Sequence, residues 1–375
     1  MLSCVDEILK SECLSRSEII TLLQAQGKER TKLFTCAAEV KQKYIGNKVY
    51  FRGLIEYSNL CAKNCLYCGI RQSNKHIGRY TMTENEVLEA VRYAYQEKYA
   101  SLVLQSGEIN TPAFIDRITD MLLKIGTITH HSMGITLSLG EQSKKTLSTW
   151  KDAGARRYLL RIETSNTELY RKIHPQNKLH DFYQRLNTIK SLREANYQVG
   201  TGVMVGLPFQ TVEDMADDLL FFREMDVDMV GMGPYIEHTD TPLYQYKNSL
   251  LSLSERFDLT LKMIAILRIM MKDINIVAST AMQTIDKMGR EKALLVGANI
   301  IMPNLTPRKY RENYLLYENK PCLDEEAYQC KSCLEARMHL IGCEIGYGEW
   351  GDSKHFENRQ DLTTEDTENT EKSLI

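Results

Sequence analysis

The stretch VYFRGLIEYSNLCAKNCLYC, residues 49–68, decides the fold because a strand pattern runs directly into a cysteine-rich loop. Residues two apart share a face of a strand, so Arg52 and Glu56 lie on one face while Phe51, Ile55 and Tyr57 lie on the other. If the apolar face meets covering helices, the charged face points into the sheet's interior. A strand that ends in a polar, functional loop is typical of an α/β barrel.

Seven further apolar runs follow this first strand along the chain. They begin near residues 101, 134, 157, 199, 228, 274 and 298. The segments between them have helical spacing, and capping signals open two of the helices, Thr83 with Glu86 and Thr211 with Asp214. Eight strand-plus-helix units predict an α/β fold of the (β/α)8 TIM-type barrel class, with an open doubly wound sheet as the alternative.

The pattern divides the chain into four regions. A helical extension, residues 1–46, has a capping box at Ser15 and Glu18 and a stop at Gly46, and it precedes the barrel, residues 47–312. A C-terminal segment, residues 313–358, is expected near the barrel mouth. Residues 359–375 are polar and are expected to form a disordered tail.

The composition excludes several classes of function. The 375 residues carry 47 Lys and Arg against 49 Asp and Glu, so no global charge favours nucleic acid or an anionic membrane. The N-terminus lacks the pattern of a signal peptide, and no run is long enough to span a membrane. We therefore expect a protein of the cytoplasm, or of an organelle matrix in an anaerobic eukaryote. In such a compartment, clustered cysteines indicate metal binding.

Polar side chains gather where the predicted strands end, which is where such barrels place their chemistry. These positions are Ser58, Gln105–Glu108, Ser138–Glu141, and Ser279 with Thr280. In addition, Arg161 and Glu163 share one face of the fourth strand, and Thr136 lies on the third. Buried charges are costly unless they are paired or bind a polar ligand, so the pattern predicts a polar ligand chamber. The alternative is an internal Arg–Glu pairing that only fixes the strand register.

Three cysteines lie in the loop at the mouth of this chamber, with the spacing Cys61-x3-Cys65-x2-Cys68 and no fourth cysteine. Zinc is one interpretation, with His76 as a fourth ligand, but a closed zinc site leaves the polar lumen unexplained. The other interpretation is a [4Fe-4S] cluster in which one iron stays open for a chelating substrate.

The cysteine spacing, with Tyr67 just before the last cysteine, resembles the signature of the radical S-adenosylmethionine (SAM) superfamily. Further segments resemble the HydE family of [FeFe]-hydrogenase maturases over roughly residues 40–340, among them RYTMTENEV, LVLQSGE, YLLRIET, MVGLPFQT, DMVGMGPYIEHTDTPL and GANIIMPNLTP. Biotin synthases and methylornithine synthases share the barrel and the first motif but fit the later segments less well. A further match is Cys322-x7-Cys330-x2-Cys333, the spacing of an accessory [2Fe-2S] or [4Fe-4S] cluster in part of the family.

The resemblance implies roles for individual residues. The cluster ligands would be Cys61, Cys65 and Cys68. The SAM contacts would be Ser106, Gly107, Glu108, Glu163, Arg185, Met302 and Tyr314. The substrate chamber would be lined by Gln105, Thr136, Arg161, Ser279, Thr280 and Tyr317, with Arg52 as a weaker candidate. Two departures from the family pattern are Phe209, where glycine is usual, and the segment HPQNKLHDFYQR, residues 174–185, which is longer than its counterpart.

The activity implied by the resemblance is reductive cleavage of SAM to a 5′-deoxyadenosyl radical. This radical would attack a cysteine-bound organometallic iron precursor of the hydrogenase H-cluster. A tyrosine-cleaving maturase would supply the precursor, and a GTPase or scaffold maturase would receive the product. Two other readings stay open. One is a biotin synthase-like or methylornithine synthase-like enzyme acting on another small molecule, and the other is a zinc-stabilised binding protein.

Overall fold

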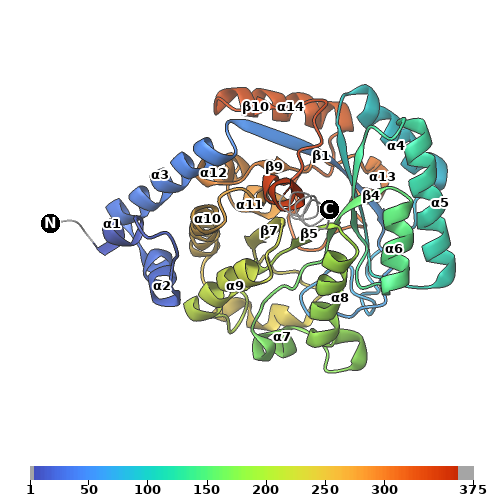
Figure 1. The fold of residues 1–375 in the computed structure, drawn as a ribbon. Coiled ribbons are helices and arrows are strands. Elements are labelled where there is room, and N and C mark those ends of the chain that lie inside the picture. The colour runs from blue at the N-terminus through green and yellow to red at the C-terminus, as the bar shows by residue number, and fades with distance from the viewer. Residues whose placement is uncertain (1–3, 362–375) are drawn as a thin grey trace, which may run out of the picture.

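A parallel β-barrel forms the centre of the computed structural model, which describes residues 4–361 (Figure 1). Its eight strands are β1 (Lys48–Ser58), β2 (Ser101–Ser106), β3 (Gly134–Ser138), β4 (Ala155–Leu159), β5 (Gln198–Thr201), β7 (Met229–Pro234), β8 (Asn275–Ala278) and β9 (Ile300–Ile301). Each strand pairs in parallel with the next, and β1 pairs with β9, so the sheet closes. The closure confirms the predicted (β/α)8 barrel and excludes the open sheet.

Helices surround the barrel between successive strands (Figure 1). They are α4 (Glu84–Gln96), α5 (Pro112–Ile128), α6 (Lys144–Asp152), α7 (Thr167–Ile173), α8 (Phe182–Glu194), α9 (Val212–Glu224), α10 (Leu253–Met270), α11 (Thr280–Ile285), α12 (Gly289–Val296) and α13 (Arg308–Arg311), with 3-10 turns at Lys178–His180 and Pro242–Ser249. Capping boxes open α4 at Thr83 and α9 at Thr211, as the sequence predicts. No helix among the described residues is long and apolar enough to cross a membrane.

The N-terminal extension forms α1 (Cys4–Ile8), α2 (Arg16–Gln24) and α3 (Gly27–Tyr44) at one side of the barrel (Figure 1). Helices α2 and α3 pack on α9 and α10, and α1 packs on α2 and α3. Ser15 and Glu18 form the predicted capping box of α2. Gly46, with a φ of +86°, follows α3 at the predicted stop.

The barrel interior is layered by the strand period of two. Register pairs place Arg52, Ser101 and Gly134 at the level where the strands begin, and Leu54, Val103 and Thr136 above them. Glu56, Gln105 and Ser138 form the next level, where the strands end. Charged and polar side chains therefore occupy both ends of the lumen. Arg52 lies at the opposite end from the polar strand ends, so it does not line the upper chamber as a substrate residue.

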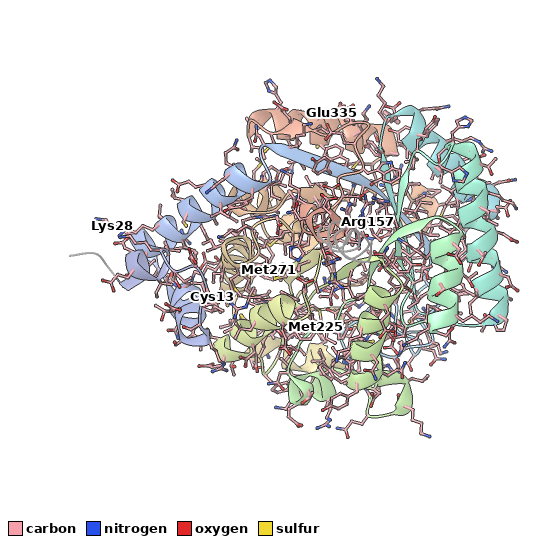
Figure 2. All side chains as sticks on the ribbon, viewed as in Figure 1. Cys13, Lys28, Arg157, Met225, Met271 and Glu335 are labelled. Carbon is pink, nitrogen blue, oxygen red and sulfur yellow. The ribbon has the colours of Figure 1, made fainter. Side chains whose placement is uncertain are left out.

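The C-terminal segment occupies both ends of the barrel, which differs from the prediction that it lies near the mouth. Helix α14 (Ala327–Leu340) and the short strands β6 (Met204–Val205) and β10 (Glu344–Ile345) lie outside the closed ring, and β10 pairs with β1. Residues 350–353 then close the end at which the strands begin, where Arg157 and Ser101 donate to the Trp350 carbonyl at 2.7 Å each and Arg52 donates to Gly351 at 2.9 Å. Figure 2 shows Arg157 close to the barrel centre, whereas Lys28 and Glu335 lie at the periphery.

Residues 354–361 form a helix over this closed end, drawn in red at the centre of Figure 1. Residues 359–361 therefore belong to the helix and not to the predicted disordered tail. The other residues of that predicted tail, 362–375, lie outside the described part of the chain.

Candidate active site

The cysteine loop follows β1 and is fastened to the turn after β2. The Glu108 N–H donates to Cys61 Sγ at 3.3 Å, the Ala62 N–H donates to the Glu108 carbonyl at 2.8 Å, and the Gly107 N–H donates to Ser58 at 2.9 Å. A Cβ at Gly107 would overlap the Leu60 carbonyl oxygen, so this close approach requires glycine. The predicted cluster loop and the predicted SAM turn therefore lie side by side.

The electrostatics of the three loop cysteines fit an iron–sulfur cluster. All three are free thiols, and burial raises the pKa of each, that of Cys65 to about 12. The charges of Cys65 and Cys61 raise the pKa of Cys68 further. Three thiolates in this buried loop need a positive centre between them, and the iron atoms of a cluster supply one. Cys61, Cys65 and Cys68 would hold that cluster.

A single zinc ion fits the loop less well. His76, the proposed fourth zinc ligand, has a side chain that is 75% exposed, and its Nδ1 lies 2.7 Å from Asp240 Oδ1. Among residues 4–361, no three His, Cys, Asp or Glu side chains converge to hold one metal ion. One tetrahedral ion needs convergent ligands, whereas each thiolate of a four-iron cluster binds its own iron.

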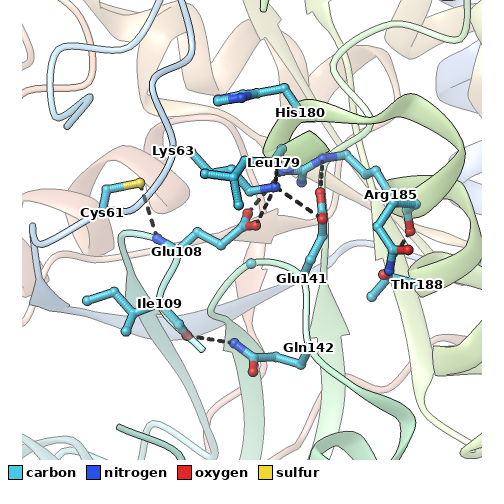
Figure 3. A network of polar contacts seen from close by, with 12 residues as sticks. Cys61, Lys63, Glu108, Ile109, Glu141, Gln142, Leu179, His180, Arg185 and Thr188 are labelled. Carbon is cyan, nitrogen blue, oxygen red and sulfur yellow. Dashed lines mark hydrogen bonds and ion pairs between the residues drawn. The ribbon is translucent and has the colours of Figure 1, made fainter. Parts of the chain in front are cut away.

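A buried ring of four charges joins the cysteine loop to three other elements (Figure 3). Lys63 Nζ lies 2.9 Å from Glu108 and 3.1 Å from Glu141, and Arg185 on α8 lies 3.0 Å and 3.1 Å from the same two carboxylates. Burial raises the pKa of Glu141, and the Arg185 charge opposes that shift. The ring brings the predicted residues Glu108 and Arg185 together, while the sequence analysis missed the roles of Lys63 and Glu141. Two features of the sequence could have indicated these roles: Lys63 lies inside the cysteine motif, and Glu141 lies at the polar end of a strand.

The two predicted charges after β4 pair with each other. Arg161 Nε donates to the Glu163 carboxylate at 3.0 Å, and Arg161 Nη2 donates to it at 2.9 Å. Arg161 also donates to the Gly231 and Val203 carbonyls at 2.6 and 2.9 Å, and Arg185 donates to the Arg161 carbonyl at 3.1 Å. The internal Arg–Glu pairing, which the sequence analysis gave as an alternative, is therefore present. It joins a predicted substrate residue, Arg161, to a predicted SAM residue, Glu163.

Polar groups without protein partners line the chamber itself. The buried hydroxyl oxygens of Thr136 and Ser279 have no hydrogen-bond partner among the described residues. Buried hydroxyls are normally hydrogen-bonded, so these two oxygens fit a polar ligand in the lumen. Nearby, Gln105 donates to the Tyr314 hydroxyl at 3.2 Å, and Tyr314 is only 1% exposed.

The remaining predicted chamber residues come from the ends of other elements. Thr280 begins α11, and Met302 follows β9. Tyr317 is half-buried, and burial raises its pKa. The sequence missed Lys320, which pairs in the lumen with Glu56 and donates to the Tyr314 carbonyl at 3.1 Å. Lys320 lies far along the chain from every strand, so no strand periodicity could place it in the lumen.

The second cysteine group lies outside the barrel ring, on and beside α14. Cys330 is 3% exposed, whereas Cys333, one turn further along the helix, is exposed. The pKa of Cys322 is raised to about 11, chiefly by burial, which the Arg290 charge opposes and the charge on Cys330 supports. Cys322 and Cys330 are thus close enough to interact electrostatically, and the charge of Cys322 also raises the pKa of the predicted chamber residue Tyr317.

Comparison with known proteins identifies the family. A model of the radical SAM superfamily matches residues 55–222, which contain the cysteine loop and the strand ends that follow it. The curated [FeFe] hydrogenase maturase subunit HydE of Thermotoga maritima is 47% identical over 86% of this chain and 88% of its own length. The chain belongs to the HydE family. Membership of the radical SAM superfamily implies a [4Fe-4S] cluster and SAM as cofactors, as predicted.

Other members of the superfamily are similar to this HydE-family chain at greater distance. The 3-methylornithine synthase of Methanosarcina barkeri is 28% identical over 90% of this chain and 92% of its own. A crystal structure of methylornithine synthase has a TM-score of 0.78 at 25% identity and covers 92% of this chain and 98% of that chain. HydG of Carboxydothermus hydrogenoformans, at 19% identity and a TM-score of 0.75 over 92% of this chain and 79% of that chain, shares the fold.

Proposed function

We propose that this chain cleaves SAM in [FeFe]-hydrogenase maturation and acts on a cysteine-bound iron carbonyl cyanide unit. The observation that carries the proposal is the cysteine loop, joined to the turn after β2 by the 3.3 Å bond from the Glu108 N–H to Cys61, above a lumen in which Thr136 and Ser279 lack partners. When bound and reduced, the cluster supplies the electron that splits SAM into methionine and a 5′-deoxyadenosyl radical. The 47% identity to a HydE supports the substrate class.

The chain's own residues divide into two sets in this proposal. One set binds SAM beside the cluster and consists of Ser106, Gly107, Glu108, Glu163, Arg185, Met302 and Tyr314. The other set encloses the substrate and consists of Gln105, Thr136, Arg161, Ser279, Thr280 and Tyr317. Arg161 fixes the Glu163 carboxylate through three hydrogen bonds, so a ribose would meet an acceptor that is already oriented.

The partners follow from the same proposal. A tyrosine-cleaving maturase supplies the organometallic precursor, and a GTPase or scaffold maturase receives the product. Cys322, Cys330 and Cys333 hold a second iron–sulfur cluster away from the lumen. We place the reaction in the cytoplasm, or in an organelle matrix in an anaerobic eukaryote, because reduced thiols and an oxygen-sensitive cluster need such a compartment.

The decisive experiment is an anaerobic incubation of the reconstituted protein with reductant, SAM and the organometallic cysteine complex, followed by product analysis. We expect 5′-deoxyadenosine, methionine and a converted iron complex in matching amounts. Free cysteine replaces the complex in a parallel control, which is expected to leave the organometallic product absent. Deoxyadenosine without conversion of the complex would contradict the substrate while leaving the SAM chemistry intact.

A methylornithine synthase-type reaction is the second candidate, favoured by the TM-score of 0.78 to that enzyme. The same incubation with a mixture of amino acids in place of the iron complex tests it directly. Formation of 3-methylornithine, the product in the name of that relative, would support this candidate over hydrogenase maturation.

A further inference from the structure

The segment between α7 and α8 lies against the cysteine loop. The Leu66 N–H donates to the Ile173 carbonyl at 3.0 Å, and Lys63 Nζ donates to the Leu179 carbonyl. Both loop residues lie between predicted cluster ligands. Figure 3 shows Leu179 and His180 above the charged ring, beside Lys63. The segment therefore contacts the cysteine motif itself and not only the rim of the barrel.

His180 contacts this loop through a defined tautomer. Asn177 Oδ1 accepts the Leu179 N–H at 3.0 Å, which identifies it as the oxygen of the amide. His180 Nδ1 lies 2.7 Å from this oxygen and so carries a proton, which leaves Nε2 to accept the Asn64 N–H at 2.9 Å. Burial lowers the pKa of His180 to about 4, so the ring is neutral near pH 7.

His174 makes the same kind of contact six residues earlier. Its Nδ1 lies 2.9 Å from the Tyr170 carbonyl oxygen, which can only accept, so Nδ1 carries the proton of the neutral ring. Its Nε2 then accepts from the Tyr67 hydroxyl at 3.3 Å, and the His174 ring stacks on Tyr170 at 3.9 Å. Burial lowers the pKa of His174 well below its ordinary value.

We propose that residues 173–181 form a clamp on the cysteine loop, in which His180 and His174 are positioning residues that orient the thiols of Cys65 and Cys68 before the cluster binds. The clamp consists of two neutral imidazole acceptors and two carbonyl acceptors from one segment, and these contact Lys63, Asn64, Leu66 and Tyr67. It rests on the cysteine loop as the cluster site and is independent of the substrate.

Two features distinguish a clamp from ordinary packing. His174 and His180 are almost fully buried, at 2% and 6% exposure. In each ring Nε2 accepts from the cysteine loop, while Nδ1 contacts an oxygen three or four residues earlier in the chain, at Tyr170 or Asn177. The His180 ring holds the Asn64 N–H, in the peptide between Lys63 and Asn64 just before Cys65, while the Ile173 carbonyl holds the Leu66 N–H just after it. Loss of the His180 acceptor leaves a buried N–H without a partner, which frees the loop without unfolding the barrel.

The test measures cysteine alkylation in the cluster-free protein, residue by residue, by mass spectrometry under native conditions. We expect His180→Phe to speed alkylation of Cys65 at least fivefold, because the ring is kept and the acceptor is lost. His180→Gln, whose amide oxygen can accept the Asn64 N–H, is expected to restore most of the protection. Cys36 and Cys343, which are partly buried elsewhere, serve as internal references and are expected to keep their rates.

A second arm uses the reconstituted protein. Iron release to a chelator is expected to be faster in His180→Phe, and the EPR spectrum of the reduced cluster is expected to change, while His76→Phe, at the exposed histidine beside the same loop, matches the parent. Equal acceleration at Cys36 and Cys343 would show global loosening and overturn the clamp. An unchanged rate at Cys65, or a Gln variant no better than Phe, would overturn it as well. Because alkylation requires neither cluster nor SAM, failure of the clamp is distinguishable from failure of the proposed function.

Discussion

Glu163 has a backbone φ of +68°, in the left-handed region where a residue with a Cβ loses roughly 1–2 kcal/mol. Two backbone hydrogen bonds hold it there, from the Glu163 N–H to Gly202 at 2.9 Å and from the Met204 N–H to the Glu163 carbonyl at 3.1 Å. This conformation aims the carboxylate at Arg161. Such strain is concentrated at functional sites, and nothing in the sequence around Glu163 reveals it.

Phe209 shows the same effect at a position where the family resemblance predicts glycine. Its φ is +70°, a conformation that favours glycine. The exposed ring packs against Tyr246 at 4.7 Å and under Lys172 at 5.2 Å. These contacts offset part of the conformational cost, so the departure leaves the turn in place.

Glu163→Gln is expected to weaken SAM use more than folding. The amide keeps the shape of the side chain but loses the charge that accepts three bonds from Arg161, a loss of roughly 1.5–3 kcal/mol for charged hydrogen bonds. We expect at least a tenfold drop in deoxyadenosine yield with a small change in melting temperature, measured on the same preparation. A large drop in melting temperature with unchanged SAM binding would make Glu163 a structural member of the ion pair only.

At the scale of helices and strands, contacts between residues close in the sequence were predictable, and contacts between separate elements were not. The capping boxes at Ser15, Thr83 and Thr211 were predictable because cap and partner lie three residues apart. The clamp segment and the charged ring were not, because Lys63, Glu141 and Arg185 come from separate elements and meet only in the folded barrel. Sequence spacing predicts the cluster ligands, but it does not predict the residues that contact the cysteine loop around them.

Replacing the cysteines on and beside helix α14 tests whether this second cysteine group takes part in the reaction. A variant with Cys322, Cys330 and Cys333 all replaced by alanine is expected to lose iron but to keep most of its SAM cleavage and hydrogenase maturation, because these residues lie outside the lumen. Iron content, deoxyadenosine yield and maturation activity are measured on one preparation. Loss of turnover with the loop cluster intact would show that the second site is catalytic.

The helix over residues 354–361 carries a charge that depends on pH. Hydrogen bonds from His355 to Asp226 at 2.7 Å and to Asp273 at 3.1 Å raise the pKa of His355 to about 9, above the ordinary value of 6.5. Because the folded pKa is raised, the stabilisation is complete below pH 6.5 and disappears as the pH rises through 9.

His355→Gln is therefore expected to lower the urea midpoint at pH 6 and to match the parent near pH 10. The effect is about 1 kcal/mol, since Asp226 is half exposed and solvent screens the pair. His339→Gln, at an exposed position on α14, is the control and is expected to leave the midpoint unchanged at every pH. If the difference in urea midpoint between His355→Gln and the parent grows toward pH 10, the charged His355 is not the source of the stabilisation.

At the scale of the whole molecule, the barrel and its polar mouth were predictable, while the closure of its other end was not. The period of two in β1 placed charges inside the lumen, and the strand ends placed the chemistry at one mouth. Residues 350–353 carry no periodic pattern, and their partners Arg52, Ser101 and Arg157 lie about 200 to 300 residues earlier. Only the folded chain shows that this segment closes the end of the barrel opposite the cysteine loop.

Asp352→Ala is expected to destabilise the whole barrel while sparing the cysteine-loop mouth. Asp352 pairs with Arg157, whose side chain is fully buried, so the variant leaves an uncompensated buried charge at a cost of roughly 3–5 kcal/mol. The urea midpoint is expected to fall accordingly, and Asp361→Ala, at an exposed position in the same C-terminal segment, is expected to match the parent. SAM binding below the unfolding transition is expected to stay at the parent level, because no residue of the charged ring contacts this end. If SAM binding falls as much as stability does, the two ends of the barrel are coupled, and the closed end belongs to the active site.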